Sequence, residues 1–202
     1  RAAGAAANFD FFVLSDSTDA DCCAEEHAAW QTLRARNTDA SIYYRRRDYN
    51  TGHKSGNIAE FCRNWGGAYD YMVVLDADSL MTGDTLVRLV RLMDANPRTA
   101  LIQAAPALIG GESLFARSQQ FASWVYGRMY TAALAKLQGP DGNYWGHNAI
   151  IRVKPFMENC GLPILSGRPP LGGEIMSHDF VEAALLRRAG WELWLLDDIG
   201  GS

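Results

Sequence analysis

The sequence predicts an α/β fold with a mostly parallel central sheet flanked by helices. Short apolar segments alternate with longer segments of helical pattern, and such alternation is typical of βαβ units. The chain has 202 residues, enough for one substantial domain with a full core. Its 48% hydrophobic and 21% charged residues are ordinary values for a globular protein. We therefore expect residues 1–202 to form a single domain.

The first half of the chain contains four predicted strands with three predicted helices between them. The strands are short and rich in β-branched or aromatic residues, and two of the helices are followed by glycine or proline. In chain order, the predicted strands are Phe9–Ser15, Ser41–Arg46, Tyr71–Leu75 and Thr99–Ala104. The predicted helices are Asp21–Arg36, Ser55–Trp65 and Thr82–Asn96.

The second half begins with a long predicted helix, Glu112–Leu137. Its apolar and aromatic residues, among them Trp124 and Met129, occupy much of the helix circumference rather than one narrow stripe. Two interpretations are open: the helix is packed in a core, or it lies against a membrane surface or another domain. The remaining predicted elements are a strand at Ala149–Val153, a Pro/Gly-rich loop at Gly161–Gly173, a helix at Phe180–Arg188 and a strand at Trp191–Leu196.

The composition bounds the partners and the environment of the chain. A net charge of -4 leaves no basic excess with which to neutralise the phosphates of a nucleic acid. The local basic run Arg45–Arg47 is interpreted as a solvated strand end rather than a polyanion patch. The four cysteines form no C-x-x-C motif, which favours a reduced, cytosolic type of environment. No apolar run approaches the ~20 residues needed to span a bilayer.

Two carboxylates follow the predicted strand Tyr71–Leu75. In an open α/β sheet, ligands bind beyond the carboxyl ends of strands, and Asp76 and Asp78 are expected there. Carboxylates at positions i and i+2 can both approach a hard divalent cation and the phosphate oxygens that it carries. Because an unpaired charge is costly to bury, these acids need water, a metal or hydrogen-bond donors. The pair is therefore a candidate metal site.

Two further segments could bind parts of a nucleotide. Asp16 follows the first predicted strand, where its carboxylate could accept from a base or a ribose, or could cap the next helix. Lys54 and Asn57 lie at the start of a predicted helix, where a lysine and exposed backbone N–H groups suit a phosphate. Gly56 permits close backbone approach. The alternative for this second segment is an ordinary helix cap.

The last candidate residues come from the second half of the chain. Asp179 precedes the predicted helix Phe180–Arg188, where the helix dipole favours the ionised carboxylate. It could act as a general base if an acceptor hydroxyl lies within reach, or it could cap the helix. Trp145, in the segment Asn143–Asn148, could provide a flat apolar platform for a sugar ring, or it could be buried in the core.

The order of these motifs resembles that of a known family. It resembles the catalytic domain of the inverting family 2 processive glycosyltransferases, relatives of cellulose synthase. Within that family, residues 144–156 and 177–185 are similar to the enzymes that build osmoregulated periplasmic glucans. The resemblance covers nearly the whole chain. The motifs that carry it are, in order, Asp16, Lys54–Asn57, Asp76–Asp78, Gly146–Arg152 and the Ser177-His178-Asp179 triplet.

The resemblance implies a Rossmann-like fold of the GT-A type and the transfer of glucose from UDP-glucose to a growing β-glucan. By position, Asp16 would contact the uridine portion, and Lys54 and Asn57 would lie near the nucleotide. Asp76 and Asp78 would hold the UDP diphosphate through Mg²⁺ or Mn²⁺. A metal between the phosphates offsets the charge that builds on the leaving UDP.

The resemblance also implies which residues serve the acceptor. Asp179 aligns with the catalytic base, and Trp145 and His147 lie where relatives line the acceptor end. The base removes the proton of the acceptor hydroxyl while that oxygen attacks the anomeric carbon from the opposite face. Inversion follows from this single displacement, so no Ser or Cys nucleophile is required.

The sequence departs from the family pattern at three points. The family's first strand is missing before Arg1, the Q-x-x-R-W segment and the flanking transmembrane helices do not appear, and His178 replaces the usual middle acid of the triplet. We therefore expect a fragment, cut at both ends, of a multi-pass protein with this domain at the cytoplasmic face of the bacterial inner membrane. The alternatives are a soluble family 2 transferase for another sugar nucleotide and a nucleotide-sugar-binding module without turnover.

Overall fold

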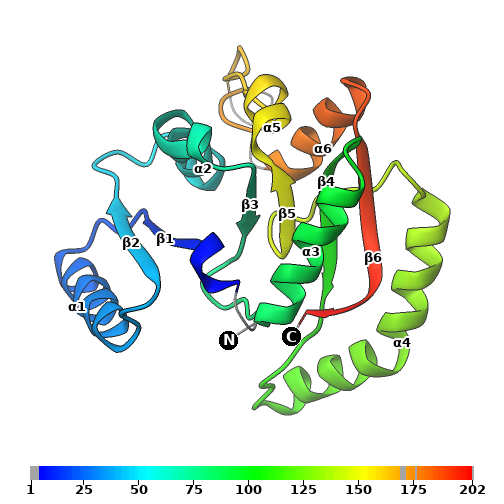
Figure 1. Cartoon of the computed structure of the whole chain (residues 1–202), viewed down its shortest axis with the longest axis horizontal. Helices are drawn as coiled ribbons and strands as arrows, with labels where there is room; N and C mark the ends of the chain where they lie inside the picture. Colours follow the sequence, from blue (N-terminus) through cyan, green and yellow to red (C-terminus); the bar gives the residue numbers. More distant parts are fainter. Residues whose placement is uncertain (1–4, 169–171, 176, 202) are drawn as a thin grey trace. The chain divides into compact units, whose positions relative to one another are not determined.

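The computed structural model describes residues 5–168, 172–175 and 177–201. Helices and strands alternate along the chain, and the predicted α/β class is confirmed (Figure 1). The chain divides into two compact units, Arg1–Asn64 and Trp65–Ser202, and each is described by itself. Part of the predicted loop Gly161–Gly173, residues 169–171, lies outside the described residues.

The first unit contains a two-stranded parallel sheet. Strands β1 and β2 pair in register from Asp10 opposite Ser41 to Ser15 opposite Arg46, so both end at the same edge. Asp19 begins α1, because its side chain accepts hydrogen bonds from the backbone N–H groups of the first helical turn. The elements of this unit are a 3₁₀ helix η1 (Ala6–Asn8), β1 (Asp10–Ser15), α1 (Ala20–Arg36), β2 (Ser41–Arg46) and α2 (His53–Trp65).

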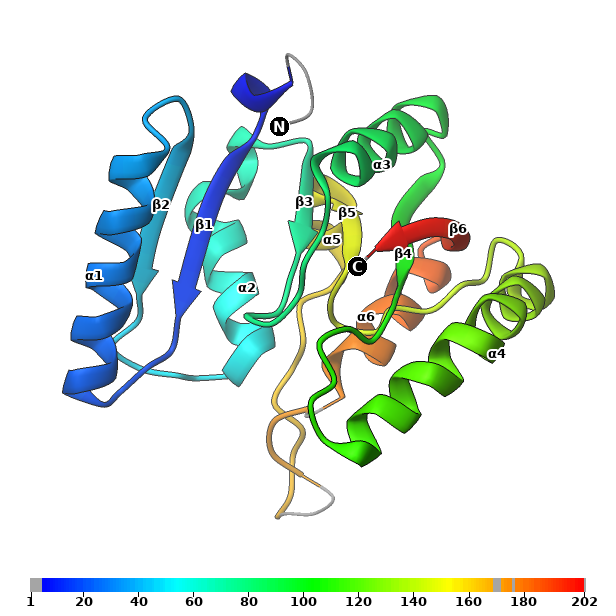
Figure 2. The same cartoon turned by 90° about the horizontal axis from the view of Figure 1, so that it is seen from below.

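Helices α1 and α2 lie on opposite faces of this small sheet (Figure 2). On the α2 face, Phe12 stacks on Tyr43 at 4.9 Å between ring centroids and meets Phe61 edge-on at 4.7 Å. On the α1 face, the Trp30 and Tyr44 rings lie 6.0 Å apart. Adjacent residues on a strand point to opposite faces, so Tyr43 lies on the α2 side of the sheet and Tyr44 lies on the α1 side.

The second unit is built on a four-stranded sheet in the order β3-β5-β4-β6. Helices and 3₁₀ turns connect the strands. The elements are η2 (Gly66–Ala68), β3 (Tyr71–Val74), α3 (Gly83–Ala95), β4 (Thr99–Pro106), α4 (Leu114–Gln138), β5 (Ala149–Arg152), α5 (Val153–Asn159), α6 (His178–Arg188) and β6 (Glu192–Gly201).

One strand of this sheet runs against the others. Strand β6 is parallel to β4, whereas β5 is antiparallel to both of its neighbours, β3 and β4. Three of the four strands share one direction, as expected for a mostly parallel sheet, and β5 is the exception. After α4 the chain reaches the sheet near the carboxyl end of β4, where Ala149 lies opposite Gln103, so β5 runs back from there.

The core of the second unit lies between the sheet and α3. Leu89 and Met93 of α3 pack with Ile102, Ala104 and Ile150, and all five are completely buried. The intervening residues of β4 are also buried, which requires layers on both faces of the sheet. Helix α3 covers one face, and α4 and α6 lie on the other (Figure 2).

Helix α5 was not expected from the sequence. It begins at Val153, directly after β5, where the predicted strand was extended by one residue. Pro155 lies in its first turn, a place where the missing N–H of proline costs no helical hydrogen bond.

Helix α4 is not packed in a core, so that interpretation of the long helix is wrong for this unit. The side chain of Thr131 is the one buried side chain among the described residues of α4. The helix lies against β6 through small residues, while its large apolar residues are exposed. These are Leu114, Phe115, Phe121, Trp124, Val125, Tyr126, Met129, Tyr130 and Leu137.

Across the described parts of the chain, no helix combines the length and apolarity that a membrane crossing needs.

Candidate functional site

The candidate site of the second unit lies where β3 and β4 end and β5 begins. In the register of the sheet, Ala149 pairs with both Val74 and Gln103. Asp76 therefore leaves the sheet two residues beyond Val74, at the edge where residues 143–148 enter it. Because β5 runs opposite to β3 and β4, the residues that precede β5 lie at the same edge of the sheet as the residues that follow β3 and β4.

Asp76 and Asp78 occupy a turn directly after β3. The backbone N–H of Ser79 donates to the Asp76 carbonyl at 3.0 Å, and the turn leaves Asp76 half-buried and Asp78 exposed. Over residues 5–168, 172–175 and 177–201, no three His, Cys, Asp or Glu side chains are grouped as a metal would require. Two carboxylates still fit the needs of Mg²⁺, which is commonly held by one or two carboxylates with substrate phosphates and water.

Tyr144 is a buried residue whose hydroxyl is influenced by three acidic side chains of this unit. Its side chain is completely buried, and its hydroxyl donates to the Gly146 carbonyl at 3.0 Å. Burial raises the pKa of Tyr144 well above its ordinary value, and the charges of Glu182, Asp179 and Asp76 raise that pKa further. The predicted base Asp179 and the predicted diphosphate ligand Asp76 thus act on the same hydroxyl group.

Asp179 lies against the segment that was predicted to bind the acceptor. A Cβ atom added to Gly146 would lie 3.5 Å from the Asp179 Oδ2 atom and 3.8 Å from its Cβ. Asp179 does not cap α6: the helix begins one residue earlier, after Ser177, and Asp179 lies within its first turn. The carboxylate is therefore directed at a neighbouring segment rather than at its own helix end.

The unexpected histidine of the triplet has an acidic partner. Nδ1 of His178 lies 3.2 Å from Oε2 of Glu182, one helical turn later, and both residues are buried. A carboxylate is thus present beside the triplet although its middle position is a histidine.

Trp145 and His147 lie in a tight turn before β5. Both are half-buried, so Trp145 is neither the fully exposed platform nor the fully buried core residue that the sequence left as alternatives. Gly146 and Asn148 have positive φ angles of 84° and 51°, which glycine and asparagine tolerate best. The backbone of this turn is held by Gln103 of β4.

In the first unit, Asp16 and Asn57 are brought together by Arg47. The Arg47 guanidinium donates to Asp16 from Nε and Nη2, both at 2.7 Å, and Asn57 Nδ2 donates to Asp16 Oδ1 at 2.8 Å. The Arg47 side chain is only 3% exposed and that of Asp16 is 27% exposed. Asp16 does not cap α1, because Asp19 does. Since β1 and β2 end together, their next residues, Asp16 and Arg47, meet at one edge.

Lys54 lies in the first turn of α2, half-buried and three residues before Asn57. Gly56 is required there by the backbone: a Cβ atom would lie 1.9 Å from the Thr51 carbonyl oxygen. The Thr51 carbonyl also accepts from Arg47 Nη1 at 3.0 Å. The close approach expected at Gly56 is therefore present, and its partner is the chain's own backbone.

The interpretation of Arg45–Arg47 as a solvated strand end is wrong for two of the three residues. Arg46 is exposed, but the side chains of Arg45 and Arg47 are 14% and 3% exposed. Arg45 donates to Glu60 and to the Asn57 carbonyl, so both buried arginines are paired. Arg45 can be buried because Glu60 and the Asn57 carbonyl of α2 pair with it, and Arg47 can be buried because Asp16 pairs with it.

Several residues that shape the sites were missed from the sequence. Arg47 was signalled only by its place in a basic run after a strand. Gln103 was signalled by a lone amide in the otherwise apolar Thr99–Ala104 segment. Tyr144 and Glu182 carried no distinctive signal, because their roles depend on burial and on partners distant in the sequence.

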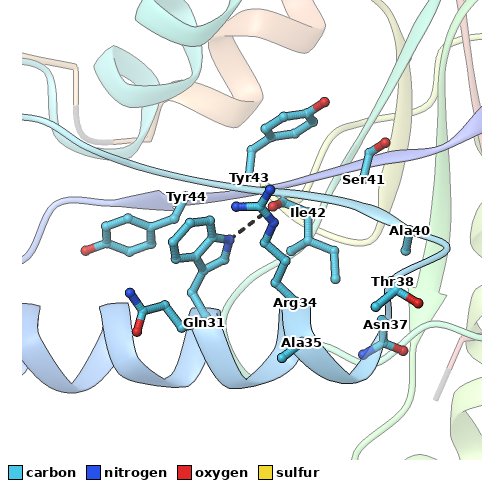
Figure 3. Close-up of a pocket in the computed structure, with 11 residues that line it drawn as sticks. Gln31, Arg34, Ala35, Asn37, Thr38, Ala40, Ser41, Ile42, Tyr43 and Tyr44 are labelled. Carbon is cyan, nitrogen blue, oxygen red and sulfur yellow. Dashed lines mark hydrogen bonds between the residues drawn. The ribbon is translucent and has the colours of Figure 1, made fainter.

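An open groove of about 970 Å³ lies between α1 and β2 (Figure 3). Among the lining residues, the Trp30 Nε1–H group donates to the Ile42 carbonyl at 3.1 Å, and the Arg34 guanidinium lies 5.6 Å from the Trp30 ring centroid. None of the residues predicted to bind a nucleotide or an acceptor lines this groove. It is therefore separate from the candidate sites.

Comparison with known proteins identifies close relatives. The family described as "Glycosyl transferase family 2" matches residues 5–159. "Glucans biosynthesis glucosyltransferase H" from Cupriavidus pinatubonensis (strain JMP 134 / LMG 1197) is 57% identical over 200 residues, which are 98% of this chain and 23% of the relative. The proteins of the same name from Dickeya dadantii (strain 3937) and Escherichia coli (strain K12) are 55% and 54% identical over 203 residues, each covering 100% of this chain. The chain spans about a quarter of the length of these curated relatives.

Proposed function

Because the chain belongs to glycosyl transferase family 2, as the order of its motifs predicted, we propose that residues 1–202 are part of one catalytic domain that transfers glucose from UDP-glucose to a growing β-glucan. The relatives named for glucan biosynthesis support the product class. The observation that carries the proposal is the position of the Asp179 carboxylate beside Gly146 in the Trp145–His147 turn, where its Oδ2 atom lies 3.5 Å from the place that a Cβ atom on Gly146 would occupy.

Asp179 is the proposed general base. Its carboxylate accepts the proton of the acceptor hydroxyl as that oxygen attacks the anomeric carbon, and UDP leaves from the opposite face. Its position supports this role: Asp179 lies in the first turn of α6, beside the turn proposed to bind the acceptor, where a base can take the proton directly.

Asp76 and Asp78 are the proposed ligands on the donor side, through Mg²⁺ or Mn²⁺ and the UDP diphosphate. A bound divalent cation would neutralise negative charge on the leaving diphosphate. The half-buried Asp76 and the exposed Asp78 share one turn, which leaves Asp78 accessible to a ligand arriving from solvent.

The remaining site residues are proposed to contact the acceptor glucan and the nucleotide portion of the donor. Trp145 and His147 are proposed to contact the acceptor glucan. Asp16 is proposed to contact the uridine portion through its exposed carboxylate edge, with Arg47 and Asn57 fixing its orientation. Lys54 is proposed to lie near the nucleotide phosphates.

Helix α4 supports a proposal about location. Its exposed face is aromatic and apolar, and between Leu114 and Gln138 it carries Arg117, Arg128 and Lys136 but no acidic residue. Cationic helices with exposed aromatic residues bind anionic lipid surfaces. We therefore place α4 at a membrane surface, consistent with a domain at the cytoplasmic face of the inner membrane.

The first test addresses the base. In the full-length protein that contains this chain, Asp179→Asn is expected to lower glucose incorporation from UDP-glucose by at least about 100-fold, because general-base catalysis contributes roughly 10²–10⁴-fold. Asp84→Asn is the control: like Asp179, Asp84 is an acid in the first turn of a helix of the same unit, and it is exposed. Wild-type turnover in Asp179→Asn would exclude the base role, and competition with other sugar nucleotides checks the donor.

The second test addresses the metal. Titration of UDP with and without Mn²⁺ is expected to show a metal-dependent gain in affinity for the wild-type protein. Asp78→Ala is expected to remove about tenfold or more of that gain, since a lost charged ligand costs at least ~1.4 kcal/mol. Asp84→Ala is the control. A metal-dependent gain that is the same in Asp78→Ala and wild type would rule out the ligand role.

A further inference from the structure

Gln103 connects the buried sheet to the proposed acceptor turn. It lies near the carboxyl end of β4 and is completely buried, although the residues around it in the strand are apolar. A buried amide is stable only when its donors and acceptor are paired. The partners of Gln103 are therefore informative.

The Gln103 side chain holds the turn on both of its sides. Its Oε1 atom accepts from the Trp145 backbone N–H at 2.9 Å, and its Nε2 group donates to the His147 carbonyl at 2.8 Å. Nε2 also lies 2.9 Å from the Ala104 carbonyl and 3.3 Å from that of Asn148. Because the Trp145 N–H can only donate and the carbonyls can only accept, these partners fix the orientation of the amide.

The turn is held in a conformation that is unfavourable by itself. Asn148 is a non-glycine residue with a φ of 51°, and its Oδ1 atom is buried without a hydrogen-bond partner in the described structure. The Nδ1 atom of His147 is also buried and has none there. Unpaired buried polar atoms and a left-handed residue are costly, so an outside constraint must keep this conformation.

The constraint bears directly on the geometry around Asp179. Gly146 lies between the two residues bound by Gln103 and has a φ of 84°, and a Cβ atom added to it would lie 3.5 Å from the Asp179 Oδ2 atom. The Tyr144 hydroxyl adds a bond to the Gly146 carbonyl from the other side. A shift of the turn would change the distance between the acceptor-binding side chains and the base.

We infer that Gln103 is a positioning residue, which fixes the Trp145–His147 turn at the distance from Asp179 that glucosyl transfer to the acceptor requires. This inference rests on the proposed function. It assigns no contact between Gln103 and either substrate. Loss of Gln103 should therefore impair transfer to the acceptor while leaving the affinity for UDP as it is.

The test uses the full-length protein with Gln103→Met, an apolar replacement of similar length. Thr99→Val is the control, because Thr99 is completely buried at the other end of β4 and its hydroxyl has no hydrogen-bond partner in the described structure. Hydrogen exchange of the Trp145 amide is followed in all three proteins, together with kcat and acceptor KM for transfer and with the affinity for UDP.

The Trp145 amide is expected to be protected in the wild type and to exchange at least about tenfold faster in Gln103→Met, as expected for a lost bond worth ~1.4 kcal/mol. Transfer is expected to fall about tenfold or more, through kcat or acceptor KM, with UDP affinity unchanged. Thr99→Val should match the wild type in every measurement.

Three results would overturn the inference: an unprotected Trp145 amide in the wild type, unchanged exchange in Gln103→Met, or wild-type transfer by that variant. A parallel loss of UDP affinity would also count against it, since it indicates general disruption. The wild-type exchange measurement remains decisive if the variant does not fold. An inactive wild type with a protected amide would refute the proposed function and leave the structural hold by Gln103 standing.

Discussion

At the residue scale, the buried Arg47 and the half-buried Asp16 of the first unit depend on each other. Arg47 binds the Asp16 carboxylate with two nitrogen atoms and also donates to the Thr51 and His53 carbonyls. A guanidinium presents several donors in a fixed fork, so one side chain can join a strand end to the turn before α2. The sequence predicted the position of Asp16 but not this partner.

Removing Arg47 should therefore destabilise the first unit. Arg47→Met leaves the Asp16 carboxylate with its bond from Asn57 but removes the arginine that pairs with it and donates to the Thr51 and His53 carbonyls. Breaking a buried pair costs about 3–5 kcal/mol, and the 27% exposure of Asp16 puts the expected loss at the lower end, about 3 kcal/mol. Urea unfolding is expected to show a loss of that order in the free energy of unfolding. Arg46→Met is the matched control, because the exposed Arg46–Asp48 pair spans 3.8 Å and such surface pairs contribute ~0–1 kcal/mol. Equal losses in the two variants would contradict the structure.

At the element scale, helix α4 shows a reversal of the usual amphipathic pattern. The side that lies against β6 carries small or polar residues such as Ser123, Gly127 and Thr131, and the aromatic residues point away. Small residues let a helix approach a sheet closely but bury little apolar surface. Most of the apolar area of α4 is therefore not buried within its own unit and is exposed to another binding surface.

Elements whose identity depends on local pattern were predicted well, and those set by distant pairing were not. The predicted strand Ser41–Arg46 is confirmed without change, and α1 differs by one residue because its cap is Asp19. The direction of β5 depends on which edge of the sheet the chain reaches after α4, and no local pattern encodes that. The same limit applied to the site, since Gln103 and Tyr144 act through contacts with segments about forty residues away or with buried charges.

At the scale of the whole molecule, charge is distributed unevenly. The chain has a net charge of -4, whereas α4 alone carries three basic residues and no acidic one. An acidic protein would be repelled by an anionic membrane unless a cationic segment faces the lipid. The proposed contact of this domain with lipid therefore depends on the orientation of α4.

Lipid contact by α4 can be measured directly. In the full-length protein in vesicles with brominated anionic lipids, tryptophan fluorescence is expected to be quenched, and Trp124→Phe should remove a clear part of that quenching because Trp124 is 78% exposed on the helix. Trp65→Phe, which changes an exposed tryptophan outside α4, is the control. Quenching in Trp124→Phe equal to that of the wild type would mean that something other than lipid covers the helix.

The reversed strand β5 also sets the order in which the second unit can be completed. Its residue Arg152 pairs with Tyr71 of β3, 81 positions earlier in the chain. Both β3 and β4 are synthesised before the strand that lies between them, and α4 is made in the interval. While the protein is emerging from the ribosome, those two strands have unpaired backbone edges, and the native sheet cannot close until β5 arrives. Ordering of the proposed acceptor turn, which directly precedes β5, is therefore among the last steps of this unit's assembly.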